Sequence, residues 1–280
     1  MTAAAVALGA RLAGLATGFV WVLWAGAAAA SICHAFVQDV PGVRYAQLGP
    51  IAQAPVERVH IEFVAHSTFR ITTPAGVVLA TDYSGYHGQG RLPDVVTMNN
   101  AHSTHYTDYP DPAIGHVLRG WNPSGDGPAE HMLELEDVVV RNVTTDIRSG
   151  FEIDREPDGN SIFVFEVAGI CIGHLGHLHH TLSDAHYAML GRMDVVMAPV
   201  DGTYTLNTLD MIEIMKKLRA SIVLPMHAFG PSSMRFFLDG MADAFEIRRQ
   251  TERAITVDVT SLPAEPTVVL LGAGGYFFDD

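Results

Sequence analysis

Alternating apolar and polar positions predict strands in the part of the chain that follows residue 55. The stretches 59–74 (VHIEFVAHSTFRITTP) and 76–86 (GVVLATDYSGY) show this alternation, which is typical of half-buried strands. Apolar runs predict further strands over 94–102, 135–147, 160–177, 193–202, 220–229, 254–260 and 266–271.

Helical spacing is confined to the second half of the chain. Apolar residues recur every three positions over 208–219, a shorter helix fits 183–190 with Ser183 as a candidate N-cap, and a further helix fits 232–245. Strands followed by strand–helix alternation predict an α/β fold whose sheets are covered by helices. Since no repeat or linker divides it, we expect residues 56–280 to form a single domain after a lead segment over 31–55.

Residues 1–30 have the pattern of a targeting segment. Arg11 precedes an uncharged stretch over 12–30, and this stretch ends in Ala28-Ala29-Ala30, which suits signal peptidase. We therefore expect export to a periplasm or the exterior; the alternative is an uncleaved anchor that holds the protein at a membrane. Cys33 and Cys171 could pair in an oxidising compartment, although nothing in the sequence requires it.

The composition limits which classes of molecule the protein is expected to bind. The 280 residues include 48% apolar residues and carry a formal net charge of −14, which excludes a disordered acidic chain and argues against nucleic acid. We expect a small-molecule substrate and no membrane contact beyond the targeting segment, while the oligomeric state is left open. The glycine-rich stretch 272–275 has no following helix, so it predicts no phosphate cradle and no organic cofactor.

Seven of the 14 histidines lie where predicted strands end. They follow the segments 94–100, 163–173 and 221–226, and polar residues at the ends of strands can line one shared pocket opening. A single histidine there often only makes a local hydrogen bond. Three such groups favour a metal site, because neutral imidazole is the commonest protein ligand for transition metals. The histidines concerned are His102, His105, His174, His177, His179, His180 and His227.

The order of these segments resembles the metallo-β-lactamase superfamily, especially its lactonase-like hydrolases. The pieces HSTFRITTPAGVVLATD, DVVTMNNAHSTH, GICIGHLGHLHHTLS, MDVVMAPVDGTYTL and SIVLPMH carry the resemblance, over about 60–227. It implies a four-layer αββα sandwich with a metal site at one edge of the two sheets.

The metal motif of that family is altered in this chain. Its H-x-H-x-D-H aligns with 100–105, so Asn100 stands for the first histidine and Thr104 for the aspartate. The bridging aspartate corresponds to His177, whereas Asp82, which in the family orients the metal cradle from behind, is kept. A two-metal centre needs a bridging carboxylate, so we expect one divalent metal. Zn²⁺ is the first choice, with Fe²⁺, Mn²⁺ or Cu²⁺ as alternatives, and the expected ligands are His102, His105, His177 and His227.

The general base is less defined. Thr104 cannot accept a proton at neutral pH, so Asp108, His180 and Asp146 are the candidates to replace the missing aspartate. His174 either faces the substrate or makes a local hydrogen bond at the end of its strand. His66 either reaches the opening of the metal site or is a packed structural histidine.

Three functions compete on this pattern. The first is an exported metal-dependent hydrolase that uses a metal-bound water on an ester, lactone, amide or phosphodiester. The second is a non-catalytic metal-binding protein on a degenerate fold, favoured by the loss of both aspartates. The third is a relic of the fold used for protein contacts. Fold alone does not choose between them.

Overall fold

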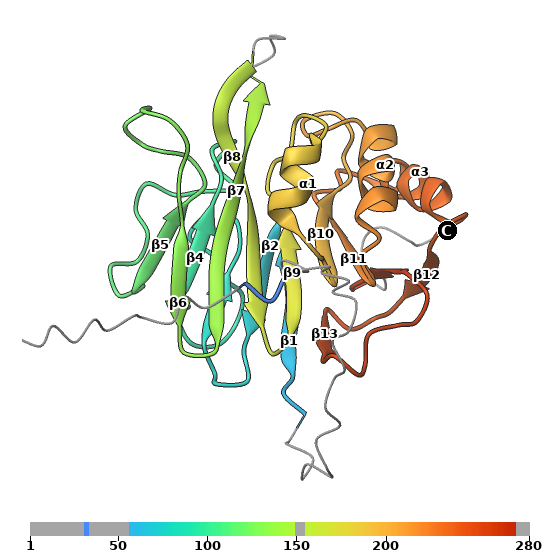
Figure 1. The fold of residues 1–280 in the computed structure, drawn as a ribbon, viewed down its shortest axis with the longest axis horizontal. Coiled ribbons are helices and arrows are strands. Elements are labelled where there is room, and N and C mark those ends of the chain that lie inside the picture. Colours follow the sequence, from blue (N-terminus) through green and yellow to red (C-terminus); the bar gives the residue numbers. More distant parts are fainter. Residues whose placement is uncertain (1–30, 34–55, 149–154, 273–280) are drawn as a thin grey trace, which may run out of the picture. The chain divides into compact units, whose positions relative to one another are not determined.

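A computed structural model describes residues 31–33, 56–148 and 155–272, and it places two sheets face to face (Figure 1). The six-stranded sheet has the order β13-β1-β2-β3-β4-β5. Its strands are β1 (Val59–Ala65), β2 (Thr68–Thr72), β3 (Val78–Ala80), β4 (Val95–Met98), β5 (His116–Arg119) and β13 (Ala254–Val257).

The larger sheet has eight strands in the order β12-β14-β11-β10-β9-β8-β7-β6. They are β6 (Met132–Leu135), β7 (Val138–Arg148), β8 (Arg155–Val167), β9 (Ile170–His174), β10 (Val195–Pro199), β11 (Ile222–Met226), β12 (Glu246–Arg249) and β14 (Thr267–Leu270). Strands β9, β10 and β11 are mutually parallel, as are β3, β4 and β5 in the other sheet. Parallel strands end at a common edge, so the residues that follow them can meet.

The main core lies between the two sheets. Phe69 and Ile71 of β2 belong to the same buried cluster as Phe163 and Phe165 of β8 and Ile172 of β9. Each such side chain contributes about 1.5–3 kcal/mol when fully buried. The alternation of apolar and polar residues in the sequence therefore arises because one face of each strand packs into this inter-sheet core.

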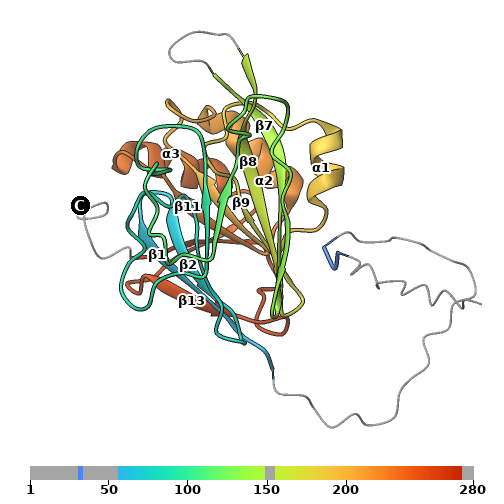
Figure 2. The ribbon, with the colours of Figure 1, turned by 90° about the vertical axis from the view of Figure 1, so that its left-hand side faces the viewer.

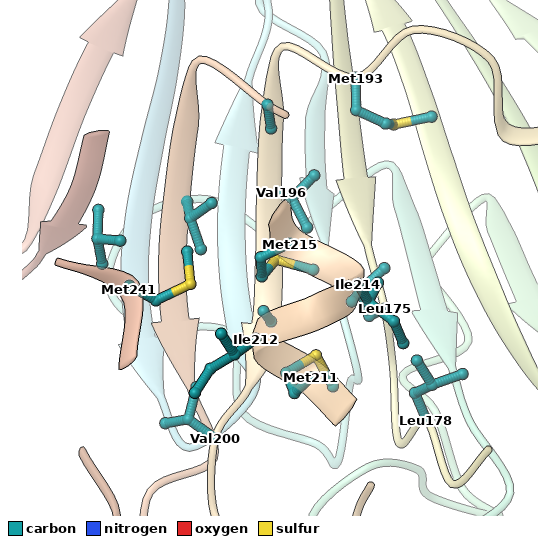
Figure 3. Packing of buried hydrophobic residues seen from close by; sticks show 14 of the residues in the cluster. Leu175, Leu178, Met193, Val196, Val200, Met211, Ile212, Ile214, Met215 and Met241 are labelled. Carbon is teal, nitrogen blue, oxygen red and sulfur yellow. The ribbon is translucent and has the colours of Figure 1, made fainter. Parts of the chain in front are cut away.

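Three helices cover the other face of the large sheet, and they lie together beside β9–β11 in Figures 1 and 2. They are α1 (Asp184–Leu190), α2 (Thr208–Leu218) and α3 (Pro231–Met241). Buried Met211, Ile212 and Met215 turn one face of α2 toward the sheet, as Figure 3 shows. The predicted helices and their sheet-covering role are confirmed, and Ser183 caps α1 as expected.

The outer face of the six-stranded sheet is covered differently. A small cluster around Tyr83, Val96 and Met98 lies there, with Tyr106 and Trp121 packed against it. None of the described helices contributes to this cluster. Helices are therefore found on only one side of the described sandwich.

Three short strands, β5, β6 and β12, were not expected from the sequence. Their residues are half-buried or exposed throughout, because β5 lies at one edge of the small sheet and β6 and β12 lie at the two edges of the large sheet. Such strands lack the apolar run on which the prediction rests. The helix expected over 232–245 ends at Met241, just before β12.

The described N-terminal fragment, residues 31–33, is bound to the large sheet. Cys33 forms a disulfide with Cys171 of β9, so the pairing that the sequence left open is present. The predicted targeting segment 1–30 and residues 34–55 of the lead lie outside the described residues. Within the described part, every helix is too short or too polar to cross a membrane.

Candidate metal centre

Four histidines from three chain segments meet at the ends of the strands. His66 lies in the turn between β1 and β2, His102 and His105 follow β4, and His227 follows β11. One ring nitrogen of each lies within 4.8 Å of the corresponding nitrogens of the others. His105 and His227 are buried, whereas His66 and His102 are half-buried. The cluster therefore opens to solvent on the side of His66 and His102.

The backbone of this site is strained. His66, Asp82 and His227 have φ angles of 50°, 41° and 55°, in the left-handed region that non-glycine residues rarely adopt. Each such residue costs about 1–3 kcal/mol, and such strain is concentrated at functional sites. The backbone N–H of His227 donates to the carbonyl of His66 at 2.9 Å, which joins two of the strained turns.

Asp82 stands behind His105. Its Oδ2 lies 2.5 Å from Nδ1 of His105, and its Oδ1 accepts a hydrogen bond from Nδ2 of Asn99 at 2.9 Å. Burial alone would raise the pKa of Asp82, but the charges of His105 and His174 and these hydrogen bonds place it below its usual range. Asp82 is therefore an ionised acceptor.

Asp201 stands behind His227 in the same manner, with 3.0 Å between Oδ1 and Nδ1. Its Oδ2 accepts from the backbone N–H groups of Thr203 and Tyr204 at 2.9 and 2.6 Å. Burial opposes ionisation, but the hydrogen bonds from His227, Thr205 and Thr203 lower the pKa of Asp201 below its usual range. This second carboxylate is also an acceptor at neutral pH.

The two carboxylates determine which nitrogens face the cluster. An ionised carboxylate only accepts, so Nδ1 of both His105 and His227 carries the proton, and both Nε2 atoms present lone pairs. These Nε2 atoms lie 3.1 Å apart. Two lone pairs at this distance repel each other unless a cation lies beside them. A carboxylate behind an imidazole is the usual arrangement for a metal-ligating histidine.

The outer pair completes the donor set. Nε2 of His66 and Nε2 of His102 are buried, and neither has a hydrogen-bond partner among the described residues. Burial, followed by the nearby histidine charges, lowers the pKa of His66 to about 3 and that of His102 to about 4. Both rings are neutral at pH 7 and can offer a lone pair. Four converging imidazole nitrogens fit a divalent transition metal such as Zn²⁺.

Residues 60–227 match the family model described as a β-lactamase superfamily domain. The chain belongs to this superfamily. The metallo-β-lactamase fold expected from the sequence is therefore confirmed, in the form of an α/β sandwich with two mixed sheets.

Solved structures agree with this assignment. A proposed zinc-dependent hydrolase of the metallo-β-lactamase superfamily from Thermotoga maritima is 25% identical, with a TM-score of 0.53, over 76% of this chain and 98% of its own. A proposed metal-dependent hydrolase from Parabacteroides distasonis is 12% identical, with a TM-score of 0.53, over 67% of this chain and 90% of its own, and it shows the fold alone. A comparison with curated proteins finds no match. The superfamily and the first of these structures favour an enzyme, as expected.

The superfamily motif predicted His102, His105, His177 and His227 as ligands. The structure brings His102, His105 and His227 together but puts His66 in the group of four. The ring centroid of His177 lies 5.0, 4.7 and 5.0 Å from those of His102, His105 and His227. His177 is thus a neighbour of the cluster, and its part in metal binding stays a prediction.

The other predicted site residues are placed as follows. Thr104 Oγ1 lies 2.8 Å from Nδ1 of His102, where it takes the position of a carboxylate acceptor. His174 is buried, and its Nε2 donates to the carbonyl of Ser67 at 2.8 Å, which is the strand-end hydrogen bond considered for it. Asn100 is half-buried, and the amide that contacts Asp82 belongs to Asn99.

The expected general bases are not joined to the cluster. Asp108 is exposed, and Asp146 accepts from the backbone N–H of Asp158 and pairs with Arg155. Neither carboxylate has a hydrogen bond to a cluster histidine within the described chain. His180 is half-buried, and its ring lies 6.5 Å from that of His179. A general base stays a prediction at Asp108 and His180.

Sequence reasoning missed Asp201 and left the role of His66 open. Asp201 follows β10 as directly as the histidines follow β9 and β11, so its strand-end position was a usable signal. His66 precedes a strand in the sequence, and only the turn geometry directs its ring into the cluster.

Two exposed aromatic residues border the cluster. Tyr204 and Phe229 are 54% and 57% exposed, and their ring centroids are 5.2 Å apart. The ring of Phe229 lies 5.0 Å from that of His227, and the ring of Tyr204 lies 6.3 Å from that of His102. We call this pair the aromatic rim. Two hollows of about 550 and 330 Å³ lie around residues 128–131, and no cluster histidine lines them.

Proposed function

We propose that this protein is an exported hydrolase that depends on one divalent transition metal, with Zn²⁺ as the first candidate. The observation that carries the proposal is the convergence of the ligand nitrogens of His66, His102, His105 and His227 within 4.8 Å, with carboxylates behind two of them. Membership of the β-lactamase superfamily supports hydrolysis as the chemistry.

The metal, when bound, would supply a Lewis acid that polarises a carbonyl or phosphoryl oxygen and activates water. The residues of the chain prepare the site for it. Asp82 and Asp201 hold the protons of His105 and His227 on Nδ1, away from the cluster. The two buried rings are therefore already oriented for a cation before it arrives.

A single metal fits the donor set better than two. The group of converging ligands consists of histidines only, with no carboxylate among its members in the described part of the chain. Two cations about 3.5–4 Å apart need a shared anionic ligand to offset their repulsion. The positions where the superfamily has aspartates hold Thr104 and His177, and neither is an anion.

The substrate is proposed to be a small ester, lactone, amide or phosphodiester with an apolar portion. The aromatic rim supports the apolar portion, because Tyr204 and Phe229 leave ring surface exposed beside the cluster. The net charge of −14 disfavours nucleic acid as the substrate.

Metal content and hydrolysis together test the proposal. Purified protein should contain close to one zinc per chain and should hydrolyse members of a panel of chromogenic esters, lactones and phosphodiesters. His102→Ala should abolish hydrolysis, whereas His60→Ala, which replaces an exposed histidine of β1, should not. Two metals per chain would contradict the mononuclear site.

A second candidate is a metal-binding protein without turnover. It is favoured by the replacement of both superfamily aspartates by Thr104 and His177 and by the absence of Asp108 and Asp146 from the hydrogen bonds of the cluster among the described residues. Tight zinc binding with no turnover across the whole substrate panel would favour this candidate.

Export is supported by the contacts of residues 31–33. Ser31 Oγ and the backbone N–H of Ile32 donate to the two carboxylate oxygens of Glu166 at 2.5 and 2.9 Å, and Cys33 is disulfide-bonded to Cys171. Disulfides persist in oxidising compartments. Cleavage after Ala30 would leave the new α-ammonium of Ser31 beside Glu166.

Mass spectrometry of the full-length gene product, expressed in an exporting host, tests this. The expected species begins at Ser31 and contains the oxidised cysteine pair. A cell-retained protein that keeps residues 1–30 and has reduced cysteines would refute export, while an oxidised protein that keeps them would be anchored.

A further inference from the structure

A short chain of hydrogen bonds ends at His177 and defines where its proton lies. The backbone N–H of Arg148, at the end of β7, donates to Nδ1 of His179 at 2.8 Å. Nε2 of His179 lies 2.8 Å from Nδ1 of His177. A backbone N–H can only donate, so the direction of the first bond is certain, and it determines the second.

The tautomers follow in sequence. Because Nδ1 of His179 accepts, that nitrogen holds no proton, and the ring proton of His179 is on Nε2. This N–H donates to Nδ1 of His177, which is therefore also an acceptor. The proton of neutral His177 must then lie on Nε2. That atom is buried and has no hydrogen-bond partner among the described residues.

His177 is neutral in this environment. Burial lowers its pKa, and the nearby charges of His105 and His179 lower it further. The pKa of His179 is lowered to about 4, first by burial and then by Arg148. The hydrogen bonds lead to the same result, because Nδ1 of each ring accepts and each ring therefore holds one proton, on Nε2.

Two kinds of histidine therefore face the same space. His105 and His227 are backed by carboxylates, which accept, and they present lone pairs, whereas His177 is backed by the N–H donor of His179 and presents its own N–H group. A protonated ring nitrogen cannot bind a cation. This agrees with the absence of His177 from the group of four converging ligands.

We infer that His177 is a hydrogen-bond donor to an oxygen atom of the substrate rather than a metal ligand, and that His179 is the positioning residue that keeps its proton on Nε2. The inference rests on the proposed hydrolase site. The ring of His177 lies 5.0, 4.7 and 5.0 Å from the rings of His102, His105 and His227, so its unpartnered N–H lies beside the region where the ligand nitrogens converge. A donor placed there stabilises negative charge that develops on a carbonyl or phosphoryl oxygen. An aspartate carboxylate at this position could only accept hydrogen bonds, whereas His177 in this chain donates one.

A matched pair of substitutions at His179 tests the tautomer. In His179→Gln, the amide oxygen can accept from Arg148 and the NH₂ group can donate to His177, so Nε2 of His177 stays protonated. In His179→Glu, the carboxylate can only accept, so the proton of His177 should move to Nδ1. Ring ¹⁵N chemical shifts of His177 in metal-free protein report this directly. Wild type and His179→Gln should show protonated Nε2, and His179→Glu should show protonated Nδ1.

Zinc binding gives a readout that does not depend on hydrolysis. His177→Ala should keep its zinc affinity within about threefold, whereas His102→Ala should lose at least about tenfold. His179→Glu should bind zinc about tenfold more tightly, because it gives His177 the carboxylate backing of a ligand. His177→Gln, which keeps a donor and most of the side-chain volume, controls for misfolding.

Inorganic phosphate, bound to the zinc-loaded protein, probes the donor itself. His177→Ala should weaken phosphate binding about tenfold or more, and His177→Gln should restore part of it. An unprotonated Nε2 in wild type, a loss of zinc in His177→Ala as large as in His102→Ala, or unchanged phosphate binding would each overturn the inference. Absence of hydrolysis with these results intact would instead count against the proposed reaction.

Discussion

The deep half of the histidine cluster, His105 and His227, differs from the outer half, His66 and His102, in what stands behind each imidazole. Behind the deep pair are buried carboxylates, whereas behind His102 is the hydroxyl of the exposed Thr104. The deep rings are therefore held in one tautomer before any cation arrives. The outer rings have orphaned nitrogens that a cation would satisfy. The difference indicates that the deep pair of histidines is preorganised for a cation, whereas the outer pair can adjust to it.

Removing a deep carboxylate should give the largest effect. Asp82→Ala leaves Nδ1 of His105 without its acceptor and should lower zinc affinity about 10- to 100-fold. Equilibrium dialysis against zinc measures it, with Asp239→Ala, an exposed aspartate of α3, as the control. An unchanged affinity would show that the deep half is not preorganised by its carboxylate.

The framework behind the deep half should be sensitive to one methyl group. Gly176 has a φ of 60°, and an added Cβ would lie 2.3 Å from Nδ2 of Asn99 and 2.5 Å from Oδ1 of Asn160. Gly176→Ala should lower the free energy of unfolding by about 1–3 kcal/mol and displace the Asn99–Asp82 contact. Urea denaturation measures the loss. Gly230→Ala, where a Cβ would meet nothing within 4 Å, should be close to neutral.

The aromatic rim should affect substrate rather than metal. Phe229→Ala removes an exposed ring 5.0 Å from that of His227. It should raise KM for aryl esters about three- to tenfold without changing zinc affinity. Equal effects on an aryl ester and on a small acetyl ester would argue against an apolar binding role.

The smallest effect is expected in the outer half. Thr104→Val removes the hydroxyl next to Nδ1 of His102 and should change zinc affinity by only about threefold, because an exposed hydrogen bond contributes little. A loss as large as that of Asp82→Ala would remove the distinction between the two halves.

Strand-end position was the most productive signal in the sequence. It found His102, His105 and His227, and the same rule applied to Asp201 would have found the second carboxylate. Asp82 came from the resemblance to the superfamily. Strands β5, β6 and β12 were missed because these edge strands lack a buried apolar run. His66 was undecided, since the direction of its ring depends on a strained turn that the apolar pattern does not record.

The sequence by itself determined the strands and the helices that cover a sheet, because apolar periodicity dictates which faces are buried, and its resemblance to the superfamily implied the two-sheet sandwich with the histidines at one edge. Only the tertiary structure decided which nitrogen of each histidine carries the proton. That choice depends on the hydrogen-bond partner of each ring. Asp82, Asp201 and the backbone of Arg148 stand 23, 26 and 31 residues from the rings that they orient. Folding brings each ring to its partner, and the partner decides whether the ring can act as a metal ligand or as a hydrogen-bond donor.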